Sequence, residues 1–262
     1  MPVPARIRTW APGTGLALSS FLALLLLWCL LAYSGAVKEL FLPRPHRVLL
    51  SFGEMHREGI LWQYTWDSTY RVMVGWAMAV ALAVPLGMLI ATSRRSAALF
   101  QPLMEFARYL PVVALVPLTL LYFGIGDLQK FMVIFLGTFF QLVLMVADTT
   151  ANVPKDLSRA AATLGANQAQ IYRLVLIPGA LPGIMDDLRI TIGWAWTYLV
   201  VAELVAANSG LGYMILRAQR FLAIERIFAG LIIIGLLGLA TDWLFKWLTR
   251  ISVPWSEKVG GP

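Results

Sequence analysis

Long apolar runs alternate with short polar stretches along the chain, which is the pattern of a protein that crosses a membrane several times. About 20 apolar residues in a helix span the ~30 Å hydrocarbon core of a bilayer. We therefore predict an all-α membrane protein with about six transmembrane helices. The predicted spans cover residues 16–37, 71–92, 109–123, 131–147, 188–207 and 227–248.

The polar stretches at the ends of these runs and between them predict further elements. Arg6 and Arg8 precede the first run, as the basic region of a signal peptide would, but no small-residue cleavage site follows, so we expect a retained first helix. Residues 46–58 predict an amphipathic helix on the outer surface. An interfacial aromatic belt is expected from Trp62, Tyr64 and Trp66.

Proline, glycine and charged residues mark further features. Pro85 and Gly87 predict a kink in the second span. Glu105 and Arg108 lie three residues apart on one helical face just before the third span, a spacing that favours an ion pair. Glycine-containing outer turns are expected at residues 123–127 and 208–212.

Composition narrows the functional classes. Of 262 residues, 59% are hydrophobic and 13% are charged, with a mean hydropathy of +0.74, whereas soluble domains carry about 25% charged residues. We assign the formal net charge of +7 to topology and to anionic lipid headgroups rather than to nucleic acid. Cys29 is the single cysteine, and we expect it to be a small buried side chain.

Residues 154–183 form the longest polar interruption in the second half of the chain and predict two short helices joined by a glycine turn. Pro154 suits the first position of a helix, and Asp156 suits its first turn, where the helix dipole favours a negative charge. The alanines at 160–162 favour that helix, and Gly165 can end it in the left-handed conformation.

A second helix is expected to follow this turn. Asn167 is a good N-cap for it, and the apolar residues after Asn167 continue the helical pattern. Pro178 and Pro182 are expected to end the helix, because proline removes a backbone donor. The two helices would present a small alanine-rich surface outside the bilayer.

The order of residues in this loop resembles a known motif. Arg159-Ala160-Ala161, Gly165 and Val175-Leu176-Ile177-Pro178 resemble the EAA loop, EAA-x3-G-x9-I-x-LP, which marks the membrane permease subunits of bacterial ABC importers. Residues from about 71 to 247 are similar to the nitrate/sulfonate/taurine-type branch. The segments that carry this second resemblance are Leu110-Pro111 to Pro117, Phe123-Gly124-Ile125-Gly126, Ala202-Glu203-Leu204 and Ser209-Gly210-Leu211-Gly212-Tyr213.

The resemblance implies a type I ABC importer permease that forms a homodimer in the bacterial inner membrane, with both termini cytoplasmic. Residues 1–70 would hold the first helix and an outer segment, 71–250 the permease core, and 251–262 a cytoplasmic tail. An ATPase subunit would dock on residues 154–183. The coupling residues implied are Arg159, Ala160, Ala161, Leu164, Gly165, Ala166 and Pro178. Arg159 replaces the usual Glu, which changes the charge contact with the ATPase but not the shape of the loop.

The resemblance also implies an external binding protein, which would dock near residues 38–70 and 208–226. The branch suggests a small anion such as nitrate, a sulfonate, taurine or bicarbonate, and other members of the branch carry neutral or cationic nitrogen compounds. The chain itself is expected to hold no cofactor, because it lacks the G-x4-G-K-[ST] phosphate loop. ATP and magnesium would be bound by the partner ATPase.

Glu203 lies inside the fifth predicted span, where an ionisable group is costly unless it is paired or faces water. It either lines the translocation path or latches a gate, makes a structural hydrogen bond, or lies exposed at the outer end of its span. Trp194 and Trp196 precede it and would wall the same path, although packed or lipid-facing tryptophans are common. Asp148 and Asp242 are expected to reach water at the inner ends of their spans.

Two rival classes have weaker support. A stand-alone secondary transporter or channel would need ionisable residues for ion coupling, which are few in the spans, and no inverted repeat is visible. An intramembrane enzyme would need a catalytic set, and the two histidines, His46 and His56, lie in the outer segment without a third metal ligand. We therefore predict a non-enzymatic subunit with no metal site.

Overall fold

The computed structural model describes residues 14–255, which form helices and no strands. The all-α prediction is therefore confirmed. Arg6 and Arg8, and most of the predicted tail, lie outside the described residues. The elements are α1 (Thr14–Tyr33), α2 (Pro45–Arg57), α3 (Ile60–Thr92), α4 (Arg94–Ala107), α5 (Val112–Phe123), α6 (Asp127–Ala151), α7 (Lys155–Thr163), α8 (Gln168–Ile171), the π-helical turn η1 (Tyr172–Leu176), α9 (Ile177–Ala206), α10 (Leu211–Arg220) and α11 (Ile224–Ser252).

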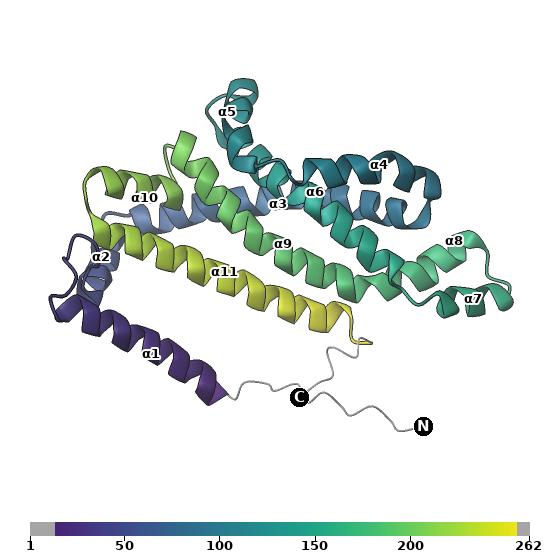
Figure 1. Cartoon of the computed structure of the whole chain (residues 1–262), viewed down its shortest axis with the longest axis horizontal. Helices are drawn as coiled ribbons and strands as arrows, with labels where there is room; N and C mark the ends of the chain where they lie inside the picture. The colour runs from purple at the N-terminus through teal and green to yellow at the C-terminus, as the bar shows by residue number, and fades with distance from the viewer. Residues whose placement is uncertain (1–13, 256–262) are drawn as a thin grey trace.

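The long helices α3, α6, α9 and α11 run roughly along the long axis of the molecule (Figure 1). At one end of this bundle lie α7 and α8, and at the other lie α2 and α10. The most extensive packing joins α3 to α6 and α6 to α9. Glycines permit these close approaches, because a Cβ at Gly75 would collide with Ile134 and a Cβ at Gly137 would collide with the ring of Tyr198.

Within residues 14–255, four stretches are long and apolar enough to cross a membrane: α3, α6, residues 168–205 and α11. The bent pair of α4 and α5 makes a fifth if the two count as one span, and α1 is a shorter apolar helix. Several helices extend past the apolar runs that predicted them. For example, α3 begins at Ile60 instead of residue 71, and it contains Pro85 within an unbroken helix.

The prediction that residues 109–123 form a single membrane-spanning helix is wrong. Helix α5 begins at Val112 and has 12 residues, about 18 Å of helix, which is too short to cross ~30 Å of hydrocarbon. It is bent by 99° from α4. Pro111 explains the break, because proline favours an extended residue before it and donates no backbone hydrogen bond. As a result α5 projects from the side of the bundle (Figure 1).

The predicted amphipathic helix near residues 46–58 is confirmed as α2, which packs against α11 and α3. Its buried face consists of Val48, Ser51 and Met55. The aromatic belt is only partly right. Trp62 and Trp66 are exposed, but Tyr64 is buried and packs edge to face on Tyr213, with 6.1 Å between ring centroids.

The structure also places the two histidines and the single cysteine. His46 and His56 are exposed, as predicted, and their Nδ1 atoms lie 2.6 Å from the Tyr33 hydroxyl and 3.0 Å from Trp62 Nε1. Cys29 is half-buried rather than fully buried.

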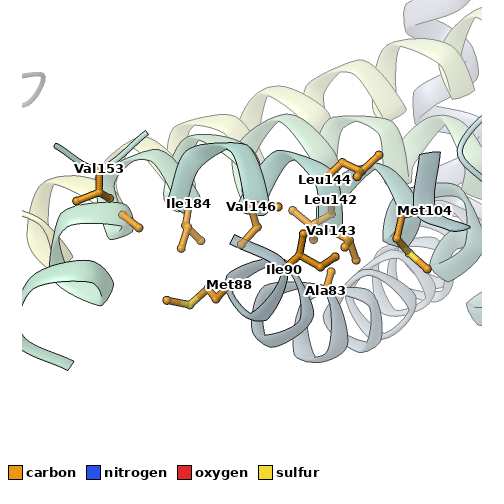
Figure 2. Close-up of a cluster of buried hydrophobic side chains, with 12 residues drawn as sticks. Ala83, Met88, Ile90, Met104, Leu142, Val143, Leu144, Val146, Val153 and Ile184 are labelled. Carbon is orange, nitrogen blue, oxygen red and sulfur yellow. The ribbon is translucent and has the colours of Figure 1, made fainter. Parts of the chain in front are cut away.

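The core near the α7 end fixes the base of the loop that follows α6. Leu142, Val143 and Val146 of α6 point toward α3 in the cluster shown in Figure 2. Val153, which follows α6 at the start of the loop, is 7% exposed and lies so close to Gly179 of α9 that a Cβ there would come within 3.0 Å of its side chain. Burying a valine side chain stabilises a fold by about 1.5–3 kcal/mol. The start of the loop is therefore held in place by the packing of Val153.

Candidate functional site

Residues 154–183 fold into the predicted order of helix, glycine turn and helix. Helix α7 carries Asp156 in its first turn, as expected, and begins after Pro154, which is its N-cap rather than its first residue. Gly165 has φ +86°, the left-handed region that favours glycine. Its N–H donates to the Ala162 carbonyl at 3.0 Å, and the Ala166 N–H donates to the Ala161 carbonyl at 3.0 Å. This hydrogen-bond pattern is a Schellman motif, which ends α7 firmly.

The second helix starts at the predicted cap. The Asn167 side chain accepts from the Gln170 N–H at 3.0 Å, and the Gln170 side chain accepts from the Asn167 N–H at 2.8 Å. This reciprocal capping box satisfies two backbone donors that a helix start leaves free. The turn between the two helices is thus specified on both sides by local hydrogen bonds.

The predicted end of the second helix at Pro178 and Pro182 is wrong. Helix α8 continues through η1 into α9 without a non-helical residue, so helical backbone joins the polar loop to a membrane span. In η1 the Ile177 N–H donates to the Tyr172 carbonyl, five residues back, so the helix widens into a π-helical turn just before Pro178.

Pro182 is accommodated by a tertiary contact. In a regular helix its missing N–H leaves the carbonyl four residues earlier, that of Pro178, without a partner. The Trp255 Nε1 donates to this Pro178 carbonyl at 3.4 Å.

The helix pair presents small and apolar side chains to solvent. No side chain of α7 is buried. Leu164 is 88% exposed at the tip of the turn. Arg159 and Asp156 are exposed and paired with each other at 3.2 Å. Of the predicted coupling residues, Arg159 to Ala166 lie on or beside this exposed tip, whereas Pro178 lies half-buried at the base of α9.

At the opposite end of the bundle, Glu203 is fully buried in a polar cluster. Its carboxylate accepts from Arg71 Nη1 at 2.6 Å, from the Ser68 hydroxyl at 2.9 Å and from the Gly212 N–H at 2.8 Å. Arg71 also donates to Asp127 at 2.7 Å. The reading of Glu203 as a residue exposed at the end of its span is therefore wrong.

The same cluster fixes the turn between α9 and α10. Arg71 donates to the carbonyl of Ser209 at 2.7 Å and to its hydroxyl at 3.0 Å. Gly210 has φ +108°, and a Cβ there would collide with the Glu203 carboxylate. Arg71 was not among the predicted site residues, although an arginine near one end of a span and a glutamate near the end of another span can form the pair that an intramembrane charge needs.

Trp194 and Trp196 do not wall the same space. Trp196 is 3% exposed, packs in the core and donates from Nε1 to the Thr241 hydroxyl at 3.3 Å. Trp194 points to the other side of α9, because residues two apart differ by about 200° around a helix. It is 37% exposed and borders a cavity of about 560 Å³ beside the α4–α5 break. Trp196 is not among the residues that line this cavity.

Two further predictions about charged residues need correction. Asp242 is part-buried and pairs with Arg189 and with Lys246, the latter at 2.7 Å, instead of reaching freely to water. Asp148 is exposed, as predicted. Glu105 accepts from Gln101 at 2.9 Å and not from Arg108, so the predicted ion pair between them is not formed.

Comparison with known proteins shows which family has this architecture. Residues 83–251 match the family of binding-protein-dependent transport system inner membrane components. The chain belongs to this family. It is 33% identical to the taurine transport system permease protein TauC of Escherichia coli over 249 residues, which are 93% of this chain and 90% of TauC.

Other members of the family agree with this placement. The permease is 32% identical over 235 residues to a putative aliphatic sulfonates transport permease protein, SsuC of Bacillus subtilis (90% of this chain, 85% of SsuC). It is 29% identical over 264 residues to the bicarbonate transport system permease protein CmpB of Synechococcus elongatus (94% of this chain, 95% of CmpB).

A solved structure has the same fold. An inward-facing structure of the MetNI methionine ABC transporter matches 74% of this chain and 97% of its own chain, with a TM-score of 0.66 and 22% identity. The resemblance to an ABC importer permease is thus confirmed, and the chain is an inner-membrane permease subunit of an ABC transporter.

Proposed function

We propose that this permease couples solute import to ATP hydrolysis by a separate ATPase subunit, which docks on α7, α8 and the turn between them. The observation that carries this proposal is the continuous helix from residue 168 to 205, which joins an exposed docking tip to a membrane span. ATP and magnesium would be held by that subunit. When the ATPase pair closes, α8 moves with it, and the motion reaches the transport helices through η1 and α9.

The docking surface favours a largely apolar contact. Leu164 is 88% exposed and Leu157 is 51% exposed, and the alanines at 160–162 let a partner approach the α7 backbone closely. Arg159 stands where the family has Glu. Its pairing with Asp156 partly neutralises its charge, so the alanine and leucine surface would carry the contact with the ATPase.

A second copy of the chain completes the membrane unit in this proposal. The break between α4 and α5 leaves residues 108–111 exposed and non-helical. Such backbone is tolerated at membrane depth only where protein or a water-filled cavity surrounds it. A homodimer supplies that cover, with α5 of each copy projecting toward the other. The α7 end would face the cytoplasm together with both termini, and the α2 and α10 end would receive an external binding protein.

The solute in this proposal is a small molecule with an anionic oxygen group. Taurine, aliphatic sulfonates and bicarbonate, named for three similar permeases, share this chemistry. A neutral or cationic nitrogen compound is the alternative, and the binding protein would make most of the selection.

Glu203 serves in this proposal as a latch at the outer end. It ties α9 to α3 through Arg71 and to the start of α10 through Gly212. Opening of the outer side would have to move these elements as one unit or break a buried ion pair. Because Glu203 is fully buried, this role is favoured over direct contact with the solute.

The test is purification of the tagged chain, in mild detergent, from cells that also produce its ATPase and binding protein. The proposal expects two permease chains and two ATPase subunits per particle, with ATPase activity stimulated by the loaded binding protein. Recovery of the permease alone, with ATPase demonstrably present in the membranes, would contradict the proposal and favour a stand-alone transporter.

A further inference from the structure

The cavity beside the α4–α5 break contains an arginine without an acidic partner. Arg108 is exposed to this cavity of about 560 Å³. Its guanidinium lies 4.8 Å from the centre of the Tyr109 ring and donates to the Tyr109 hydroxyl at 2.8 Å. Among the ion pairs of residues 14–255, none includes Arg108.

The cavity lies near the middle of the transmembrane region. Its wall on α6 includes Gly137 and Gln141, which flank the midpoint of that 25-residue helix. Its wall on α9 includes Trp194 and Tyr198. A cationic side chain at this depth costs several kcal/mol unless it meets water, a counter-charge or a ligand.

A second cavity continues the first toward the α7 end. It measures about 310 Å³ and shares Arg108 with the first. Both cavities lie along one face of α6, because their α6 wall residues repeat with the period of a helix. These wall residues are Leu136, Gly137, Phe140, Gln141, Leu144, Ala147, Asp148 and Ala151. The spaces therefore form a groove that runs from the middle of the bundle to its inner end.

The charges change along this groove. The first cavity has aromatic and amide walls with Arg108 as its charged side chain, whereas the second is also lined by Glu105 and Asp148. An anion is attracted at the first position and repelled at the second. This order gives a single weak anion site in the middle of the groove and favours release once the anion moves inward.

We propose that Arg108, in the cavity walled by Gln141 and Trp194, binds the anionic oxygen group of the solute during its passage through the membrane. A guanidinium donates two parallel hydrogen bonds to a sulfonate or carboxylate, and the amide of Gln141 supplies a further donor. Trp194 and Tyr109 offer apolar surface to the rest of a small solute. The inference rests on the proposed import of a small anion and adds a site within the permease to the selection made by the binding protein.

The test measures the charge preference of the cavity with thiol reagents, so it depends neither on transport nor on the ATPase. Cys29→Ala removes the native thiol, and Gln141→Cys places a new one in the cavity wall. The protein, in phosphatidylcholine nanodiscs without anionic lipid, is treated with an anionic ethylsulfonate methanethiosulfonate or a cationic trimethylammonium one. Reaction rates are compared with Arg108 intact, with Arg108→Lys and with Arg108→Gln.

The expected anion-to-cation rate ratio is about tenfold higher with Arg108 or Arg108→Lys than with Arg108→Gln, since each unit charge a few ångströms away changes the local ion concentration severalfold. Millimolar ethanesulfonate should slow the reaction in the Arg108 protein only. Arg250→Gln, which changes an exposed arginine at the end of α11, should leave the ratio unchanged.

Two results would overturn the inference. One is a thiol at position 141 that does not react with either reagent, which would mean that a second copy or a lipid fills the cavity. The other is a ratio that is the same with Arg108 and with Arg108→Gln, while both proteins remain monodisperse. Failure of the ATPase to co-purify would contradict the proposed function but would leave these rate ratios readable.

Discussion

Arg71→Met should be among the most damaging single substitutions in the bundle. Glu203 is 0% exposed, and Arg71 is its charged partner at 2.6 Å. Removal of the guanidinium leaves a carboxylate buried without its counter-charge, which lowers the free energy of unfolding by about 3–5 kcal/mol. The substitution also removes the two hydrogen bonds that Arg71 donates to Ser209, so the turn before α10 should loosen.

The pair of Arg226 and Glu58 provides a matched control. It joins α11 to the end of α2 through side chains that are 31% and 44% exposed. Exposed ion pairs contribute roughly 0–1 kcal/mol, so Arg226→Met should have a small effect. The double substitution Arg71→Met with Glu203→Gln should recover part of the loss, because it removes the buried charge as well as its partner.

The assay is reversible unfolding of the purified permease in mixed detergent micelles, followed by far-UV circular dichroism. Hydrogen exchange at residues 207–212 reports the turn in the same samples. The reasoning would be refuted if Arg71→Met and Arg226→Met lowered stability equally, or if Glu203→Gln gave the double variant no advantage over Arg71→Met.

Four more substitutions test the proposed coupling loop and the two tryptophans. Gly165→Glu forces a side chain into a φ of +86° at the docking tip and should uncouple uptake from ATP hydrolysis; coupled transport at the wild-type ratio would contradict this. Asn167→Ala removes the capping box and should destabilise α8 by about 1 kcal/mol, seen as faster local hydrogen exchange, with unchanged exchange as the contrary result. Trp196→Ala should lower stability by about 3–5 kcal/mol in the same unfolding assay, whereas Trp194→Ala, at a cavity wall, should lower it far less; equal losses would place both in the core.

Local sequence signals predicted the loop well. The left-handed glycine at 165 and the cap at Asn167 depend on interactions within a few residues, so the residue types alone indicate them. The end at Pro178 was misjudged because a π-helical turn and a distant hydrogen bond from Trp255 offset the missing donors. Neither feature has a signature in the residues beside the prolines.

Tertiary partners account for the other differences. Glu203 stood out as an ionisable residue in a span, but its partner Arg71 is 132 residues away and no local pattern links them. Trp194 and Trp196 were treated together because they are close in sequence, although helical geometry puts them on different faces. The break at Pro111 was indicated by proline, yet the 99° bend depends on how α5 packs against α6 and α9.

Photocrosslinking from the docking tip tests the central claim most directly. A photoreactive benzoyl-phenylalanine replaces Leu164, which is 88% exposed, and in a control chain it replaces Leu26 of α1, which is 65% exposed. Irradiation of membranes that contain the permease and its ATPase should give a permease–ATPase adduct from position 164 and none from position 26. Absence of the adduct at position 164, in membranes where the ATPase co-purifies with the permease, would contradict the claim that α7 and α8 form the coupling surface.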